Sequence, residues 1–554
     1  MKIVVRLYKC RILDFIFFFW MISILPLLSI FLTRFMVLHH YKRSICYSVF
    51  FAFLLYIVSL NFGKRVRLLL FGVTYIVAFV PALIVLSHLL IASVYLRDDK
   101  FIPVFLTNVR EASDFVNAFM SLKIVLCLFA YFIPPLVYLI WQMKRGARER
   151  DILDGVKQRY RIFFMTASVS MMIWFAYENV RSVYVLDFYS AYVNYRTELR
   201  NFGKLAQERQ HRTEYKVTAT SPTGDPKVFV IVIGESLSRH HMSLYGYSRE
   251  TNPLLKAQEK DLLIFKNVVS GNVTTNTALP MVLTFADNKH PDDFFTKPSI
   301  IDLFRNAGFT TYWITAQTFI NGASESLYGT IAKTVDSLKD CSFEWDYKKD
   351  EGVLNPLGQT LDNFAKRNIV IFVHLQGSHL TYNETYPLDF NYFDDSFPFQ
   401  TSLQQLSPDE KQVINEYDNS VRYNDYVVSS IINIVKQRSL FSYVLYFSDH
   451  GEEVFDFREV MFHDPNIKSR YMCDIPFILW RSDNYKKSVK IDEDVSRPYS
   501  TEDVIYSISQ LSGLSYKAYD STKSVFSPAF KLKERLVGGI PYDSLVPLQQ
   551  YSSH

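Results

Sequence analysis

The chain has 554 residues, of which 49% are hydrophobic and 21% charged, and its net charge is only +5. This length has room for two or three domains, and the near-neutral total argues against a disordered chain and against nucleic-acid binding. The charge is uneven, because residues 1–190 carry 22 Lys and Arg against 10 Asp and Glu, whereas the rest carry 38 against 45. The basic third is also strongly apolar, which excludes a wholly soluble protein.

Five apolar stretches in the first 180 residues approach the roughly 20 residues that a helix needs to span a bilayer. We expect membrane helices near 12–33, 44–60, 67–94, 121–141 and 160–178. The first stretch follows basic residues, as a secretory signal does, but it is too long and no small-residue cleavage site follows it. Residues 1–180 are therefore predicted to form a five-helix transmembrane domain.

The orientation follows from the bias of Lys and Arg in short loops, which favours the cytoplasmic side. The segments 1–11, 64–67 and 144–161 are basic, whereas the connection 95–120 is balanced; the loop at 34–43 opposes the trend. The N-terminus is therefore expected in the cytoplasm. With five crossings, everything after about residue 180 lies on the other side of the membrane.

The region 181–226 is expected to join the membrane domain to a soluble domain at 227–554. Its first part, up to about residue 212, is amphipathic and aromatic, which favours an interfacial helix. A Pro-, Gly-, Ser- and Thr-rich stretch, TATSPTGDP at 218–226, marks the boundary.

From residue 227 onwards, short apolar runs alternate with helical patterns, which is typical of an α/β domain with a mostly parallel central sheet. The expected strands are KVFVIVIG (227–234), FTTYWIT (309–315), IVIFVHL (369–375), SYVLYFS (442–448) and IPFILW (475–480). Helices are expected at 299–308, at 408–438 and after a cap at Ser500 or Thr501. Continuous apolar runs indicate strands buried on both faces.

Polar side chains follow three of these strands. Glu235 comes directly after the first, Asp449 and His450 follow the fourth, and the segment HLQGSH (374–379) ends the third. Ligands in such sheets gather beyond the carboxyl ends of the strands. Carboxylate oxygens with an imidazole nitrogen suit Zn²⁺, whereas an all-oxygen set would suit Mg²⁺ or Ca²⁺. The pattern predicts a zinc site at this edge.

The segment SGNVTTNTALPMVLTF (270–285) is dense in threonine and is expected to open a helix near Pro280. A helix N-terminus can hold an anionic phosphate, and a threonine hydroxyl needs a metal or a base before it can act as a nucleophile. Only two cysteines, Cys341 and Cys473, lie in the soluble part. A disulfide between them and a pair of buried thiols are equally compatible with the sequence.

Together these segments resemble the membrane-bound phosphoethanolamine transferases of Gram-negative bacteria, of the alkaline phosphatase and sulfatase superfamily. The most specific stretch is VIVIGESLSRHHMSLYGYSRETNPLL (230–255), which is similar to the family's strand, G-E-S, L-Y-G-Y and T-x-P run. The resemblance implies five transmembrane helices in the inner membrane and a periplasmic catalytic domain. It also implies transfer of phosphoethanolamine from phosphatidylethanolamine to lipopolysaccharide or another envelope glycan.

The resemblance also implies roles for single residues. The implied zinc ligands are Glu235, Asp449, His450 and Thr275, and Thr275 is also the nucleophile that takes up phosphoethanolamine, although Thr274 and Thr277 are close by. His379 and His463 match two histidines near the phosphate, with catalytic and substrate-binding roles. Thr107 and Glu111, in TNVREASDF, would face the donor headgroup.

One departure bears on the acceptor. The branch that modifies lipid A has a cysteine directly after the proline of the nucleophile segment and several disulfides, whereas this chain has Met281 there and few cysteines. The sequence looks closer to members that act on core sugars or other glycans.

Three alternatives remain open at this stage. A glycerol-phosphate transferase of the lipoteichoic acid synthase kind has a similar plan but lacks the L-Y-G-Y run. A sulfatase would need a Cys or Ser in a C/S-x-P-x-R setting, which is absent; a membrane-anchored phosphatase is the related hydrolase. A catalytically silent sensor or glycan-binding protein would have no need to retain Glu235, Thr275, Asp449 and His450 together.

Overall fold

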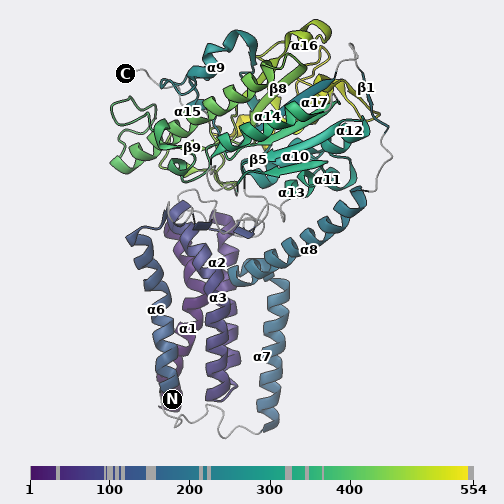
Figure 1. Cartoon of the computed structure of the whole chain (residues 1–554). Helices are drawn as coiled ribbons and strands as arrows, with labels where there is room; N and C mark the ends of the chain where they lie inside the picture. The colour runs from purple at the N-terminus through teal and green to yellow at the C-terminus, as the bar shows by residue number, and fades with distance from the viewer. Residues whose placement is uncertain are drawn as a thin grey trace. The chain divides into compact units, whose positions relative to one another are not determined.

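Figure 1 shows a computed structural model of the chain. It describes residues 2–32, 38–92, 95–96, 101, 104–105, 112–113, 116, 119–144, 158–210, 216–220, 226–317, 327–342, 349–364 and 367–546. The chain forms two compact units, one of residues 1–105 and 119–198 and the other of residues 106–118 and 199–554. Each is described by itself.

The first unit is a bundle of long helices: α1 (Lys2–Leu32), α2 (Leu38–Leu60), α3 (Lys64–Ala92), α6 (Leu122–Lys144) and α7 (Gln158–Glu178). Helix α1 packs against α2 and α3, while α6 packs on α3 and α7 on α2. Helix α8 (Tyr184–Gln210) follows as one continuous helix of 27 residues where an interfacial helix was expected. Aromatic side chains such as Phe17, Phe18 and Phe71 fill the interior of this bundle.

Within the described residues, four helices are long and apolar enough to cross a membrane: Ile12–Leu32, Arg43–Leu60, Lys64–Ile91 and Leu122–Lys144. The fifth expected span corresponds to α7, whose apolar part, Ile162–Glu178, is shorter. Serine and threonine interrupt its apolar residues, which lowers its hydropathy. The predicted number of five spans is therefore not confirmed.

The second unit is built on a seven-stranded sheet. In spatial order its strands are β3 (Leu262–Ile264), β11 (Phe477–Arg481), β8 (Phe441–Ser448), β2 (Lys227–Gly234), β7 (Ile369–His374), β5 (Thr310–Thr315) and β6 (Ser337–Asp340). Every residue of β2, β7 and β8 is buried, as continuous apolar runs predict. Shorter strands form separate pairs: β1 (Thr218–Ala219) with β13 (Leu514–Ser515), β4 (Val268–Val269) with β12 (Tyr499–Ser500), β9 (Glu453–Val454) with β10 (Met461–Phe462), and β14 (Leu536–Val537) with β15 (Ile540–Pro541).

The sheet is mostly parallel, as expected, but a single antiparallel strand makes it mixed. Strands β8, β2, β7, β5 and β6 run parallel, but β11 is antiparallel to both β8 and β3. A parallel neighbour needs a crossover that returns the chain to the opposite edge. Residues 449–476 contain the β9–β10 hairpin and no α-helix, so the chain re-enters the sheet in the reverse direction.

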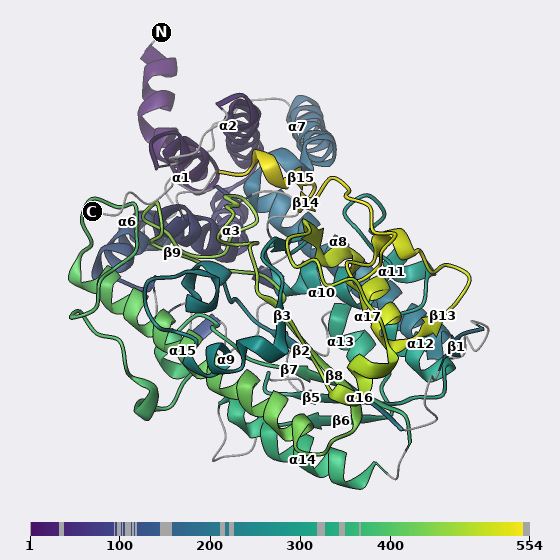
Figure 2. The same ribbon diagram turned by 90° about the horizontal axis from the view of Figure 1, so that it is seen from above.

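Helices cover both faces of the sheet, and Figure 2 shows the layers from above. One face carries α10 (Thr275–Leu283), α12 (Ile300–Asn306), α13 (Leu327–Ala332), α16 (Asp483–Ser488) and α17 (Val504–Ser512). The other carries α9 (Pro253–Ala257), α14 (Leu354–Asn363) and α15 (Pro408–Lys436). The short helix α11 (Asp293–Thr296) precedes α12. Alternate residues of β2 feed two separate cores, with Ile231 in one and Val230 in the other.

The expected helices are present with sequence-encoded caps. Ser299 with Asp302 forms a capping box at α12, and Ser407 with Glu410 forms another at α15. The helix expected after Ser500 begins as a short 3-10 turn before α17.

Candidate active site

The register of two central strands brings the candidate metal ligands to one level. Gly234 of β2 pairs with Ser448 of β8, so Glu235 and Asp449 leave neighbouring parallel strands side by side. Directly after Glu235 the backbone of Ser236 adopts a left-handed conformation with φ 57°. A non-glycine residue rarely adopts this conformation, and such strain is concentrated at functional sites.

Helix α10 brings the threonine hydroxyl to the same place. Thr275 is the first residue of α10, which begins five residues before Pro280. Its hydroxyl donates a hydrogen bond to Glu235 Oε1 at 2.8 Å and lies 3.3 Å from His450 Nε2. Thr274 and Thr277 instead bond to each other at 2.7 Å. The structure therefore singles out Thr275 among the three threonines by its contacts.

Glu235, Asp449 and His450 form a buried group with one ligand atom from each lying within 4.8 Å of the others. Within the described part of the chain, Asp449 Oδ2 is buried and accepts no hydrogen bond. His450 Nδ1 lies 2.9 Å from the carbonyl oxygen of Gly451. Donation at Nδ1 leaves the lone pair on Nε2, which faces the carboxylates. An orphaned carboxylate oxygen and an imidazole nitrogen that faces the carboxylates fit a divalent cation.

The electrostatics of this group point the same way. Burial and then the charge of Glu235 raise the pKa of Asp449 to about 8. Burial lowers the pKa of His450, but Asp449 and Glu235 outweigh it and raise that pKa to about 10. Burial also opposes ionisation of Glu235, yet His450 brings its pKa below the usual range. Two buried carboxylates thus compete for one positive charge, which a metal ion supplies more strongly than a proton.

The two further histidines lie in different surroundings. The His463 ring lies tilted against that of His450, with centroids 4.2 Å apart, so it lies next to the buried group of candidate metal ligands. His379 is half-buried, and its Nδ1 lies 3.4 Å from the carbonyl oxygen of Leu380. The first histidine of HLQGSH, His374, is fully buried, and burial lowers its pKa to about 4.

Comparison with known proteins identifies the family of the chain. Residues 227–514 match the sulfatase family. Over an alignment of 567 residues, the chain is 32% identical to the phosphoethanolamine transferase CptA of Salmonella typhimurium, and the alignment covers 95% of each protein. The chain belongs to the membrane phosphoethanolamine transferases of the alkaline phosphatase and sulfatase superfamily.

Solved structures of this family support the assignment. The periplasmic domain of EptC from Escherichia coli, in complex with Zn, is 34% identical and matches with a TM-score of 0.56 over 60% of this chain and 96% of that domain. The integral membrane lipooligosaccharide phosphoethanolamine transferase A from Neisseria meningitidis is 19% identical and shares the fold, with a TM-score of 0.61 over 89% of this chain and 93% of that one.

Within this phosphoethanolamine transferase, Gln317 contacts the candidate metal-ligand group of Glu235, Asp449 and His450. Sequence reasoning did not find this glutamine. Its side-chain nitrogen donates to Glu235 Oε2 at 2.8 Å, across 82 residues of sequence, and lies 3.2 Å from the Leu375 carbonyl oxygen. This hydrogen bond fixes the orientation of the Glu235 carboxylate. Gln317 follows strand β5, so the rule of examining strand ends would have found it had amides been considered with carboxylates and imidazoles.

A second missed contact holds the threonine segment. Asn288 is not one of the candidate metal ligands. Its side-chain nitrogen donates hydrogen bonds to the carbonyl oxygen of Gly271 at 2.9 Å and to Glu502 at 2.6 Å. A Cβ at Gly271 would lie 2.6 Å from Glu502 Cγ. The start of the segment therefore rests directly on the buried side chain of Glu502.

Two sets of predictions have other outcomes. Thr107 and Glu111, expected at the donor headgroup, lie outside the described residues. Cys341 and Cys473 are both buried and are not joined to each other by a disulfide.

Proposed function

We propose that this enzyme transfers phosphoethanolamine from phosphatidylethanolamine to lipopolysaccharide or another envelope glycan through a covalent intermediate on Thr275. The observation that carries the proposal is the placement of the Thr275 hydroxyl, 2.8 Å from Glu235 Oε1 and 3.3 Å from His450 Nε2. A threonine hydroxyl is a weak nucleophile by itself and needs such surroundings. Names of full-length relatives support phosphoethanolamine as the transferred group.

Glu235, Asp449, His450 and Thr275 would hold a zinc ion, as the donor set and the orphaned oxygen of Asp449 indicate. Zn²⁺, when bound, would supply positive charge that lowers the pKa of the Thr275 hydroxyl, so that this hydroxyl could give its proton to water. The zinc complex of the E. coli EptC domain supports this choice of metal.

The transfer then proceeds in two steps at Thr275. Thr275 attacks the phosphorus of phosphatidylethanolamine, and diacylglycerol leaves while phosphoethanolamine stays on the threonine. An acceptor hydroxyl or phosphate attacks the same phosphorus and restores Thr275. The positive end of the α10 dipole lies at Thr275 and stabilises negative charge on the phosphoryl oxygens. We assign His379 and His463 to the phosphoryl group and Thr107 and Glu111 to the donor headgroup.

The membrane helices fit a lipid donor, and we place the protein in the bacterial inner membrane with residues 227–554 in the periplasm. The long apolar helices of the first unit support the anchor. Met281 after Pro280 and the small number of cysteines in the soluble part favour core sugars or other glycans over lipid A as acceptor.

The test is a comparison of threonine variants in the full-length protein. Thr275→Ala should abolish transfer and remove the phosphoethanolamine adduct from the 270–285 peptide, as measured by mass spectrometry. Thr277→Ala is the matched control, because Thr277 is exposed and contacts only its own segment. An adduct that persists in Thr275→Ala contradicts the nucleophile, and glycerol phosphate on this peptide would favour the lipoteichoic acid synthase chemistry instead.

A further inference from the structure

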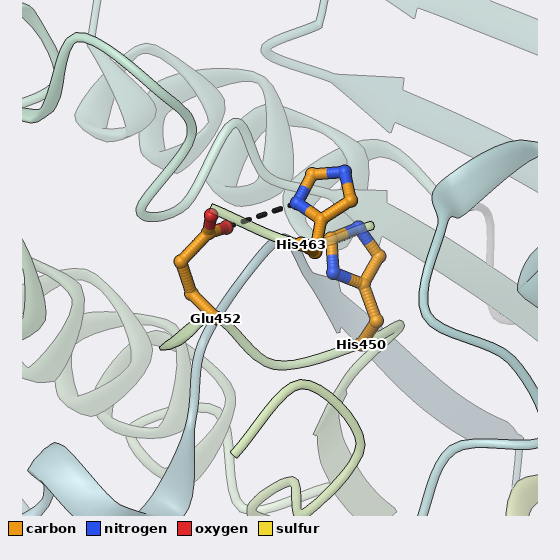
Figure 3. A group of neighbouring side chains, drawn as sticks. All are labelled: His450, Glu452 and His463. Carbon is orange, nitrogen blue, oxygen red and sulfur yellow. Dashed lines mark hydrogen bonds and ion pairs between the residues drawn. The ribbon is translucent and has the colours of Figure 1, made fainter. Parts of the chain in front are cut away.

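A second group of metal-type ligands lies beside the first: His450, Glu452 and His463 (Figure 3). His450 cannot serve both groups. Its Nε2 faces Glu235 and Thr275, and its Nδ1 lies against the Gly451 carbonyl oxygen. Without His450, the second group retains two side chains, fewer than the three protein ligands of a catalytic zinc site.

The two remaining side chains contact each other. Glu452 Oε2 lies 3.1 Å from Nδ1 of His463, and Figure 3 shows the other ring nitrogen of His463 pointing away from Glu452. The carboxylate is 1% exposed, and its second oxygen has no hydrogen-bond partner within the described residues. The His463 side chain is 25% exposed, so one partner is fixed in the interior and the other reaches solvent.

The surroundings of Glu452 hold it in place. Burial, and then the charge of Glu452, raise the pKa of Tyr382 well above its usual value. Tyr382 therefore stays neutral and adds no second negative charge. Tyr417, packed edge-on against Tyr382, is kept neutral in the same way by burial and by Glu452. The carboxylate thus has two neutral phenol rings near it on the interior side and the imidazole of His463 at 3.1 Å on the other.

We propose that Glu452 is a positioning residue that holds His463 with Nδ1–H toward its carboxylate and Nε2 toward the phosphoryl group. This rests on the proposed function. When Thr275 forms its bond to phosphorus and the bond from phosphorus to the glycerol oxygen breaks, that oxygen takes the proton of Nε2 and leaves as diacylglycerol. When an acceptor attacks, Nε2 takes the acceptor's proton and the bond from phosphorus to Thr275 breaks. The ring is positive before the first step and after the second, and a carboxylate on Nδ1 stabilises it in that state.

The test uses two donors that differ only in the group that leaves. Phosphatidylethanolamine vesicles release a glycerol oxygen that needs a proton, whereas p-nitrophenyl phosphoethanolamine releases an anion that does not. The rates measured are diacylglycerol release and nitrophenol release by the full-length protein, with Thr275 adduct formation followed in parallel. None of these requires the identity of the acceptor.

Glu452→Ala should slow diacylglycerol release by about 100-fold, within the usual contribution of a positioned proton donor, and nitrophenol release by less than about 3-fold. Glu452→Gln keeps an oxygen for Nδ1–H and should lose less with the vesicles. Glu459→Ala, which removes an exposed carboxylate from the same loop, should change neither rate. Zinc content and the thermal midpoint are measured for each variant to separate catalysis from folding.

Equal losses with both donors in a folded, zinc-loaded Glu452→Ala protein would overturn the positioning role while leaving the transferase function intact. If the wild-type protein released no diacylglycerol and formed no Thr275 adduct, the proposed function itself would fail.

Discussion

The hydroxyl of Thr275 lies 2.8 Å from Oε1 of Glu235, although 40 residues separate them in the chain. The glutamate is fixed at the end of a central strand, and the threonine opens a helix on one face of the sheet. The contact therefore depends on how α10 packs on the sheet. Metal binding, the residues that orient the ligands and the position of the threonine segment all depend on this packing.

Removal of the metal should lower the stability of the protein. Chelation leaves two buried carboxylates, Glu235 and Asp449, beside each other without a cation. Added Zn²⁺ should raise the thermal midpoint, since a ligand at 100 times its dissociation constant stabilises by about 2.7 kcal/mol. Asp449→Asn should lose most of this shift. An equal shift in the variant would place the stabilising zinc elsewhere.

Gln317→Ala should weaken zinc binding without changing any ligand. The amide fixes the outer oxygen of Glu235, and removal of such supports costs about 10- to 100-fold in metal affinity. Competition with a chromophoric chelator measures the change. Gln412→Ala, at an exposed glutamine of α15, is the matched control. Unchanged affinity in Gln317→Ala would show that the backbone alone orients the glutamate.

Gly271→Ala should displace the threonine segment. The added methyl would lie 2.6 Å from Glu502 Cγ and 3.2 Å from Met281 Sδ, so the segment must move. We expect a loss of about 1–3 kcal/mol in stability and slower formation of the Thr275 adduct. Gly358→Ala within α14 meets only Arg438 at 3.6 Å and should be neutral or stabilising. Normal adduct formation in Gly271→Ala would mean that Glu502 yields instead.

His241 should make stability depend on alkaline pH. Burial lowers its pKa, but Asp456 and Asp418 outweigh burial and raise it to about 10, above the ordinary value of 6.5. The folded state then binds a proton that the unfolded state releases. The resulting stability is complete below about pH 6.5 and is lost as pH rises through about 10.

The measurement for His241 is the thermal midpoint between pH 7 and pH 10. It should fall more steeply in the wild-type protein than in His241→Asn, which has no proton to lose there. The variant should also be less stable at pH 7, because Asp418 and Asp456 lose the partner they share. Parallel pH profiles would contradict a charged His241.

Sequence reasoning expected Glu235, Asp449 and His450 at one edge because parallel strands share a carboxyl edge, and the structure brings these three residues together. Once the strands before Glu235 and Asp449 are recognised in the sequence, these two residues are expected at the same edge. The register of β2 and β8 then places them side by side. The choice of Thr275 over Thr274 and Thr277 came from family resemblance. Composition alone cannot choose between threonines that lie so close together at the start of a helix. In the structure, however, the hydrogen bonds of the three hydroxyls differ clearly.

Other features depend on contacts between distant segments. Gln317 lies at a strand end, but its contact with Glu235 exists only in the folded chain, as does the contact of Glu452 with His463. The direction of β11 was equally invisible, since an apolar run reads the same in either direction. The fifth expected span differs for another reason. The apolar part of α7 is close to the smallest length and hydropathy of a helix that can cross a membrane.

Strand β8 lies between β2 and β11, and it brings Asp449 and His450 to the group more than 200 residues after Glu235 in the chain. During synthesis, a chain that has been made only as far as β7 already carries its glutamate and threonine but has nothing to complete their surroundings. The group of Glu235, Asp449 and His450 is therefore complete only once this late strand has entered the middle of the sheet. We expect a product that ends before β8 to be inactive.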